Sequence, residues 1–386
     1  MNTIIPVVLL SLIAFTATAA ELPSKERSIL NEVERTQKRG LDWLLKQQKP
    51  DGSWDNHPAI SALAATAFLR SGQKLNDDQQ QAVDRAMKFI LSNVKTNGAI
   101  YRGDETDKYP NYSTAISIMA LSATRNPQYV ETIRRARDFL LNSQFDESSD
   151  IVVTNASYGG IGYGERQRPD LSNTAWTLEA LRVAENYMKQ LDQPAPTGWD
   201  LHWQKAIVFL QRCQNLPSHN DQPWAKNTTD QDLGGFIYMP GVSLANHGQP
   251  TDEKTPLRSY GSMGYAGLKS YIYADLKKDD PRVVAAVNWL KHNYTLDENP
   301  NMGSAGLYYY LQTFAKALTA YGDDTLTDAS GKAHDWRYDL MNKLVSLQQN
   351  AGFWVNDNGR WWENNPVLVT SYSLLALDIA QAHHYP

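Results

Sequence analysis

Four polar residues surround the start of one apolar segment near the middle of the chain. Arg166 and Arg168 lie in a Gly-rich loop, and Asp170 and Asn173 follow where an Ala/Leu-rich stretch, 174–184, takes up helical spacing. A Gly-rich loop can bring guanidinium groups close to a bound molecule. Asp and Asn before a helix most often cap its first turn. We therefore expect the arginines to contact a ligand, and Asp170 and Asn173 either to cap the helix or to face that ligand.

Comparable boundaries, where a polar loop leads into an apolar helix, recur along the chain. Free backbone N–H groups and the positive ends of helix dipoles gather at such boundaries, so the polar side chains there are candidates for ligand binding. The expected binding residues are Arg166, Arg168, Asn173, His57, Tyr112, Arg258, Tyr260, Tyr308 and Asn364. Each also has a structural interpretation, as a helix cap, a loop residue or part of the core. The aromatic residues that could line a cavity are Trp361-Trp362, Trp354, Trp224 and Tyr308–Tyr310.

The elements that must position these residues form a repeat. A helix ending in Gln, a Gly-rich loop with an aromatic residue, a polar turn and an Ala/Leu-rich helix occur six times, with a core unit of about 40–50 residues. The second helix of each pair is apolar all round and is expected inside, whereas the first carries charge on one face and is expected outside. The last helix, 370–379, is as apolar as an interior one, which favours a closed ring over an open solenoid. The pattern predicts an all-α fold, an (α/α)6 toroid of six helix-pair repeats.

Composition and the N-terminal segment indicate the kind of partner and the cellular location to expect. The chain has 386 residues and a formal net charge of −5, which provides no electrostatic footprint for nucleic acid. Residues 1–20 combine an apolar run, 4–15, with small residues, and are interpreted as a secretory signal peptide, leaving 21–386 as a single toroid domain. No later stretch is long enough to span a membrane. The protein is expected to be exported, periplasmic or extracellular, with its one cysteine, Cys213, buried on a helix.

Four of the units carry a more specific pattern, in which a Gln precedes a Gly-rich turn and, in three of them, an aromatic residue. These are Gln48…Gly52-Ser-Trp54, Gln144…Gly159-Gly160, Gln214…Gly234-Gly-Phe236 and Gln349…Gly352-Phe-Trp354. They resemble the Gln–Trp repeats of squalene and hopene cyclases and are similar to the repeats of protein prenyltransferase β subunits. The resemblance covers nearly the whole chain after residue 20, and it implies an (α/α)6 toroid.

The resemblance also identifies where catalysis would lie. The cyclases protonate their substrate with an Asp-x-Asp-Asp-Thr-Ala motif, whose counterpart is Asp170-Leu-Ser-Asn-Thr-Ala175. Asp170 matches and is the candidate catalytic residue, but Ser172 and Asn173 replace the second and third acids. The second acid is the proton donor, and a serine hydroxyl cannot protonate an alkene. We expect a protein that binds an isoprenoid, a lipid or a peptide in a central cavity, without class II cyclase activity.

Two alternatives remain open at this point. One is a terpenoid cyclase-like enzyme with a displaced acid, for which Asp170, Asp104, Glu105 and Asp107 are candidates. The other is a polysaccharide lyase or glycosidase on the same kind of toroid, with Tyr260 as base beside Arg258. No Cys/His spacing resembles a metal site, and no cofactor is expected. The expected partner is a small hydrophobic or extended ligand, and the oligomeric state is left open.

Overall fold

The computed structural model describes residues 24–104, 107–164, 167–191, 199–247 and 254–382. Within them lie twelve α-helices in two sets. The outer helices are α1 (Ser24–Gln47), α3 (Asp77–Ser92), α5 (Val130–Asn142), α7 (Trp199–Cys213), α9 (Pro281–His292) and α11 (Trp336–Leu347). The inner helices are α2 (Pro58–Leu69), α4 (Pro110–Ala123), α6 (Leu171–Gln190), α8 (Gly261–Tyr273), α10 (Leu307–Tyr321) and α12 (Pro366–Gln381).

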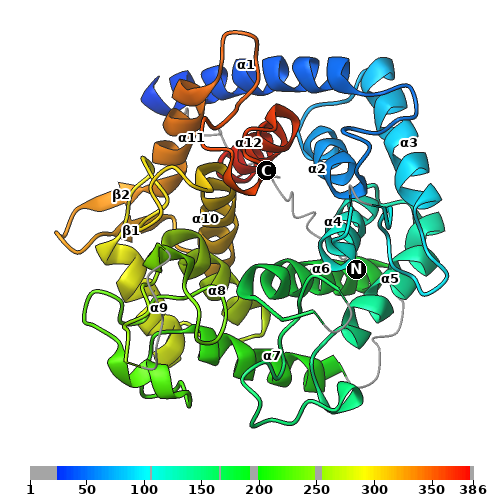
Figure 1. Cartoon of the computed structure of the whole chain (residues 1–386). Coiled ribbons are helices and arrows are strands. Elements are labelled where there is room, and N and C mark those ends of the chain that lie inside the picture. The colour runs from blue at the N-terminus through cyan, green and yellow to red at the C-terminus, as the bar shows by residue number, and fades with distance from the viewer. Residues whose placement is uncertain (1–23, 105–106, 165–166, 192–198, 248–253, 383–386) are drawn as a thin grey trace, which may run out of the picture.

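The inner helices form a closed ring. Each packs against the next, from α2 through α4, α6, α8 and α10 to α12, and α12 packs against α2 (Figure 1). The outer helices surround them, and α1 packs against α11 and α12. The predicted all-α toroid is confirmed.

Burial explains which helices lie inside. In α2 every residue from Pro58 to Phe68 is buried, as expected for a helix that is apolar all round. In α3 only one stripe is buried, made by Ala82, Val83, Ala86, Met87 and Ile90. Its other side carries charge and faces solvent. The sequence contrast between the two helices of a pair therefore translates directly into an inner and an outer wall.

The repeated Gln joins neighbouring units. The Nε2 of Gln48 donates to Gly52 O in its own turn (2.9 Å) and to Ala82 O on the next outer helix (2.7 Å). Gln144 and Gln214 make the same pair of bonds two and three units further on. In the last unit Gln348 donates to Gly352 O (2.9 Å) and to Thr36 O on α1 (2.8 Å), which closes the ring. The residue that makes this bond is Gln348 rather than the predicted Gln349, because only Gln348 has the four-residue spacing to glycine found at Gln48.

The glycine of each turn is required by close packing. Gly159 has φ of 84°, and a Cβ there would lie 1.8 Å from the backbone oxygen of Lys205 on α7. A side chain would therefore meet both backbone strain and an immovable carbonyl. The same positive φ and the same approach to the next outer helix occur at Gly52, Gly98, Gly234 and Gly352.

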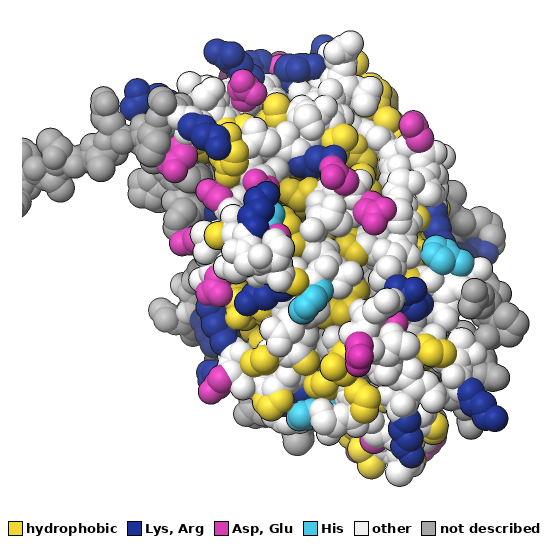
Figure 2. All heavy atoms as spheres, turned by 90° about the vertical axis from the view of Figure 1, so that its left-hand side faces the viewer, with side chains coloured by type: hydrophobic (Ala, Val, Ile, Leu, Met, Phe, Trp, Pro, Cys, Tyr) yellow, Lys and Arg dark blue, Asp and Glu magenta, His cyan; other side chains and the backbone are white. Residues whose placement is uncertain are grey.

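The remaining elements are small. Strands β1 (Thr325–Thr327) and β2 (Ala333–Asp335) pair antiparallel in a hairpin before α11. Short 3₁₀ turns occupy loops at Pro127–Tyr129, Glu147–Ser149, Pro223–Asn227, Leu244–Asn246 and Arg360–Trp362. The face formed by α9, α11 and the hairpin intersperses basic, acidic and hydrophobic side chains (Figure 2). Cys213 is fully buried, as predicted. Of the helices described, none has the length and apolar character needed to cross a membrane.

Candidate functional site

A cavity of about 230 Å3 lies at the N-terminal ends of the inner helices and is called here the N-side cavity. Its wall combines the first turns of these helices with the loops that precede them. Ten of the twenty lining residues are Tyr or Trp. The lining residues are His57, Ala59, Ile60, Leu63, Tyr109, Tyr112, Ile116, Tyr163, Ser172, Trp176, Tyr238, Leu244, Tyr260, Ser262, Met263, Tyr309, Trp361, Trp362, Leu368 and Tyr372.

The hydroxyl groups in this wall bind mainly to one another. Tyr112 donates to Ser172 Oγ (2.6 Å), which also lies 2.9 Å from the hydroxyl of Tyr309. The hydroxyls of Tyr163 and Tyr238 are 2.8 Å apart. Burial raises the pKa of Tyr309 to about 12 and that of Tyr112 well above its usual range, so both phenols stay protonated. The cavity therefore presents mostly aromatic faces, and five of its hydroxyl groups are engaged with one another.

Asp170 lies behind this wall and is not among its lining residues. It is the N-cap of α6: one carboxylate oxygen accepts from the backbone N–H of Asn173 (2.8 Å) and the other from its Nδ2 (2.7 Å). Burial raises the pKa of Asp170 to about 6, although these bonds and one from Tyr238 oppose the rise. The carboxyl thus serves the helix terminus, and Ser172 occupies the position that faces the cavity.

His57 and Asp107 form a second polar pair at the cavity wall. His57 Nδ1 accepts from the backbone N–H of Ala59 (3.2 Å), which leaves the proton on Nε2. That nitrogen is 3.7 Å from Asp107 Oδ1, and the carboxylate is held by the Ser113 hydroxyl. Burial lowers the pKa of His57 despite the neighbouring carboxylate, so the imidazole is neutral at pH 7.

Two adjacent tryptophans edge the cavity. Trp361 and Trp362 have φ of 55° and 65°, a backbone conformation that bulky residues rarely adopt. Trp362 packs edge-on against His57 and Tyr109, and Trp361 sits against Gly306, where a Cβ would collide with its ring. Both indoles remain about two-fifths exposed. Such strain persists where the surroundings impose it, and it concentrates at functional sites.

Glu363, the next residue, anchors this loop and gave no signal in the sequence. Its carboxylate accepts from the backbone N–H groups of Tyr308 (3.2 Å) and Tyr309 (2.7 Å) at the start of α10, and from Asn356 Nδ2 (2.7 Å). Burial raises its pKa to about 7. The same carboxylate therefore fixes both the tryptophan loop and the helix that presents Tyr309.

The structure brings only some of the predicted binding residues to this cavity. His57, Tyr112 and Tyr260 line it, and Asn173 lies directly behind it, bound to Asp170. Tyr308 is buried beside the cavity, whose wall instead receives Tyr309. The exposed residues Arg168 and Asn364 do not line it. Arg166 lies outside the described residues.

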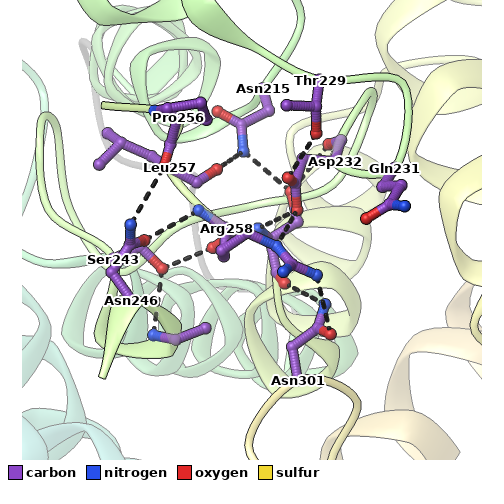
Figure 3. A network of polar contacts seen from close by, with 12 residues as sticks. Asn215, Thr229, Gln231, Asp232, Ser243, Asn246, Pro256, Leu257, Arg258 and Asn301 are labelled. Atoms are coloured by element: carbon purple, nitrogen blue, oxygen red, sulfur yellow. Dashed lines mark hydrogen bonds and ion pairs between the residues drawn. The ribbon is translucent and has the colours of Figure 1, made fainter. Parts of the chain in front are cut away.

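Arg258 belongs to a separate polar network between two long loops (Figure 3). Its guanidinium donates to Asp232 Oδ1 (3.1 Å) and to Asn301 Oδ1 (3.1 Å), and Asp232 also accepts from the backbone N–H of Ser259 (2.9 Å). Arg258 lines a different, polar hollow, whereas Tyr260 lines the N-side cavity. The predicted Tyr260–Arg258 lyase pair is thus not assembled around one cavity.

No group of three or more His, Cys, Asp or Glu side chains suited to a metal ion occurs within the described residues. The described wall of the N-side cavity offers aromatic rings, hydroxyl chains and the His57–Asp107 pair.

Comparison with known proteins finds terpenoid cyclases among those similar to this chain. No family model matches the chain. It is 24% identical over 244 residues to squalene–hopene cyclase of Alicyclobacillus acidocaldarius, a match that takes in 59% of this chain and 35% of that enzyme. It is 29% identical over 138 residues to copalyl diphosphate synthase of Streptomyces cyslabdanicus, covering 35% of this chain and 25% of that enzyme. The matches thus span about a third or less of the length of these relatives.

Solved structures agree over a longer span. A variant of the type II terpene cyclase MstE from Scytonema, in complex with its product merosterolic acid A, matches with a TM-score of 0.52 at 12% identity, covering 92% of this chain and 99% of that one. A second variant, bound to the substrate geranylgeranyl dihydroxybenzoate, gives a TM-score of 0.51 with the same coverage and identity. The chain therefore has a terpenoid cyclase-like fold.

Proposed function

We propose that this terpenoid cyclase-like toroid binds an isoprenoid chain in the N-side cavity and holds it without protonating it. The observation that carries the proposal is the composition of the wall. Aromatic rings dominate it, and five of its hydroxyls are paired with one another. The motif resemblance further implies that Ser172 replaces the proton donor of the cyclases. Such a wall favours an apolar, unsaturated ligand, for which aromatic faces offer close packing.

The size of the cavity supports a ligand segment rather than a whole triterpene. A protein cavity of about 150 Å3 accommodates benzene, so 230 Å3 accommodates roughly nine or ten non-hydrogen atoms by proportion. That corresponds to about two isoprene units. The remainder of a longer chain would leave past Trp361 and Trp362, whose partly exposed rings edge the cavity.

The polar groups support an apolar ligand over a sugar. A sugar ring needs donors and acceptors that are free to bind its hydroxyls, because a buried polar group without a partner is costly. Here Tyr112, Ser172 and Tyr309 form one hydroxyl chain, and Tyr163 and Tyr238 form a second pair. Among the lining residues described, no carboxyl faces the cavity.

Titration of the purified protein with geraniol and farnesol, followed by tryptophan fluorescence and calorimetry, tests the proposal. Leu368, on α12, lines the N-side cavity, so Leu368→Trp should fill it and weaken binding at least tenfold. Val183, on α6, lines a different cavity, and Val183→Trp serves as the matched control with binding unchanged. Equal affinity of both variants and the original protein for farnesol would overturn the proposal.

The His57–Asp107 pair supports a second candidate, a terpenoid-acting enzyme with a displaced acid. His57 lines the cavity, and its Nε2–H has no hydrogen-bond acceptor among the described residues, while Asp107 lies 3.7 Å behind it. As the imidazolium, which Asp107 would stabilise, His57 could deliver a proton to a basic oxygen of a bound terpenoid and return to the neutral imidazole. If so, His57→Gln and Asp107→Asn would each abolish conversion of an epoxide or alcohol substrate, and conversion that survives both would dismiss this candidate.

We further propose that the protein acts after export. The apolar run 4–15 followed by small residues supports this, and these positions lie outside the described residues. Fractionation of the source cells would test it, with the protein expected outside the cytoplasm and shortened by about 20 residues. Full-length protein in the cytoplasmic fraction would contradict it.

A further inference from the structure

A second cavity, of about 580 Å3, lies at the opposite end of the ring and is called here the C-side cavity. It is formed by the middle and C-terminal parts of inner helices α2, α4, α6, α10 and α12. Leu63, Ile116 and Trp176 line both cavities and form the floor between them. The bore of the toroid therefore contains two chambers that share one apolar partition.

Two buried lysines share one carboxylate beside this partition. Glu179, on α6, accepts from Lys269 Nζ on α8 through Oε2 (2.6 Å) and from Lys316 Nζ on α10 through Oε1 (2.7 Å). Both ammonium groups also lie over the ring of Trp176, at 5.5 and 4.3 Å from its centroid. All three charged side chains are less than one-tenth exposed. Two ammonium groups and one carboxylate leave the cluster with a net charge of +1, and an uncompensated charge is costly in a buried site.

Lys316 faces the C-side cavity, together with hydroxyls that lack a partner. Lys316 is a lining residue, and each ammonium has three N–H donors, of which the structure assigns one to Glu179. Ser122 Oγ and the Tyr187 hydroxyl, both on lining residues and more than nine-tenths buried, make no hydrogen bond within the described part of the chain. Unused buried donors of this kind are uncommon and require a partner.

The charges around the cavity favour an anion. Lining residues Arg70 and Arg125 add positive charge at its edge, and Arg70 pairs with Asp378 (3.1 Å). Lys316, Lys269, Arg70 and Arg125 together outnumber Glu179 and Asp378 by two. Both lysines lie a full turn or more before the ends of their helices, where the helix dipole no longer compensates their charge. The rest of the wall is largely apolar, including Leu69, Met119, Val183, Leu375 and Ile379.

We propose that the C-side cavity is a second binding site, for an amphipathic carboxylate whose head group pairs with Lys316 and whose apolar chain packs on the aliphatic wall. A monoanion matches the single positive charge that Glu179 leaves uncompensated. Hydrogen bonds from the Ser122 and Tyr187 hydroxyls are available to a ligand that enters this chamber. This site does not depend on the ligand of the N-side cavity.

Calorimetric titration of the full chain with decanoate, decanol and decyltrimethylammonium tests the site. Decanoate should bind at least tenfold more tightly than decanol, and the cation should not bind. Lys316→Met keeps the aliphatic stem and removes the charge, so it should weaken decanoate binding at least tenfold. Lys278→Met is the matched control, because Lys278 is half exposed and pairs with Asp323 on the surface. Its affinity for decanoate should change less than twofold.

Cavity-filling variants keep the proposal falsifiable if Lys316→Met does not fold. Val183→Trp should abolish decanoate binding, while Leu368→Trp, which fills the N-side cavity, should leave it intact. Decanol binding as tightly as decanoate, or binding lost in Leu368→Trp and retained in Val183→Trp, would overturn the proposal. Because the two variants act on separate chambers, failure of this site and failure of the isoprenoid site give different results.

Discussion

The contribution of ring closure to stability can be tested at one residue, because a single glutamine side chain joins the last unit to the first. Gln348 Nε2 donates to Gly352 O and Thr36 O, at 2.9 and 2.8 Å. Gln348→Ala removes both bonds and leaves two partly buried carbonyls without this donor. Losing a partner costs about 1–3 kcal/mol for a fully buried group and less where water can enter. We therefore expect the free energy of unfolding to fall by about 2 kcal/mol.

The adjacent residue provides the control. The Gln349 side chain is exposed, and only its backbone bonds to the turn and to Arg39, so Gln349→Ala should change stability by less than about 0.5 kcal/mol. Urea unfolding at 25 °C, monitored by circular dichroism, gives the free energy of unfolding of both variants, and an unchanged slope m confirms two-state behaviour. Gln214→Ala should cost more than Gln348→Ala, because Gln214 is fully buried and also accepts from Tyr271 (3.0 Å). A destabilised Gln349→Ala with a neutral Gln348→Ala would refute the reasoning.

Three further predictions concern the turns, the anchor of the tryptophan loop and the loop itself. Gly159→Ala should prevent folding, since its Cβ would lie 1.8 Å from Lys205 O. Gly303→Ala, also at positive φ but with open space around it, should cost only about 1 kcal/mol of stability. Soluble yield and thermal melting distinguish the two variants, and equal behaviour would contradict the packing argument. Glu363 has a pKa of about 7 in the native state and 4.5 when unfolded, so the native state binds its proton more tightly. This proton binding contributes about 3 kcal/mol to the free energy of unfolding below pH 4.5, and the contribution is lost as pH rises through 7. Glu363→Gln should lose that dependence between pH 4.5 and 7 in urea midpoints, and an unchanged slope would show that the carboxyl titrates normally. Trp362→Ala should weaken farnesol binding about tenfold through lost contact area, as measured by calorimetry, and unaltered affinity would remove the loop from the site.

The fold was predictable because it depends on periodicity, which a sequence displays directly. The contrast between α2, buried over its whole length, and α3, buried along one stripe, is visible as the presence or absence of charge. The turn positions were predictable because a Gly follows each Gln before the inner helix, four residues later in the first and last units and 15 or 20 residues later in the third and fourth. The one error of register, Gln349 for Gln348, came from two adjacent glutamines of which only one has the four-residue spacing.

The site was predictable only where it lies at a helix start. His57, Tyr112 and Tyr260 directly precede or begin inner helices, so their place followed from the repeat. Tyr309 rather than Tyr308 faces the cavity because rotation of 100° per residue decides between neighbours, and only coordinates fix that rotation. The triad of Glu179, Lys269 and Lys316 joins residues 90 and 137 positions apart on three helices, and no local pattern indicates it.

The most direct test of the central claim is the fate of a bound isoprenoid. The protein would be incubated with farnesol and, separately, geranylgeraniol, the complex isolated, and the extracted ligand analysed by gas chromatography with mass spectrometry. Because cyclisation leaves the mass unchanged, chromatographic retention and fragmentation distinguish the products. The aromatic wall with Ser172 in place of an acid predicts that the linear alcohol is recovered intact from the original protein and absent from Leu368→Trp. Recovery of a cyclic isomer would contradict the account.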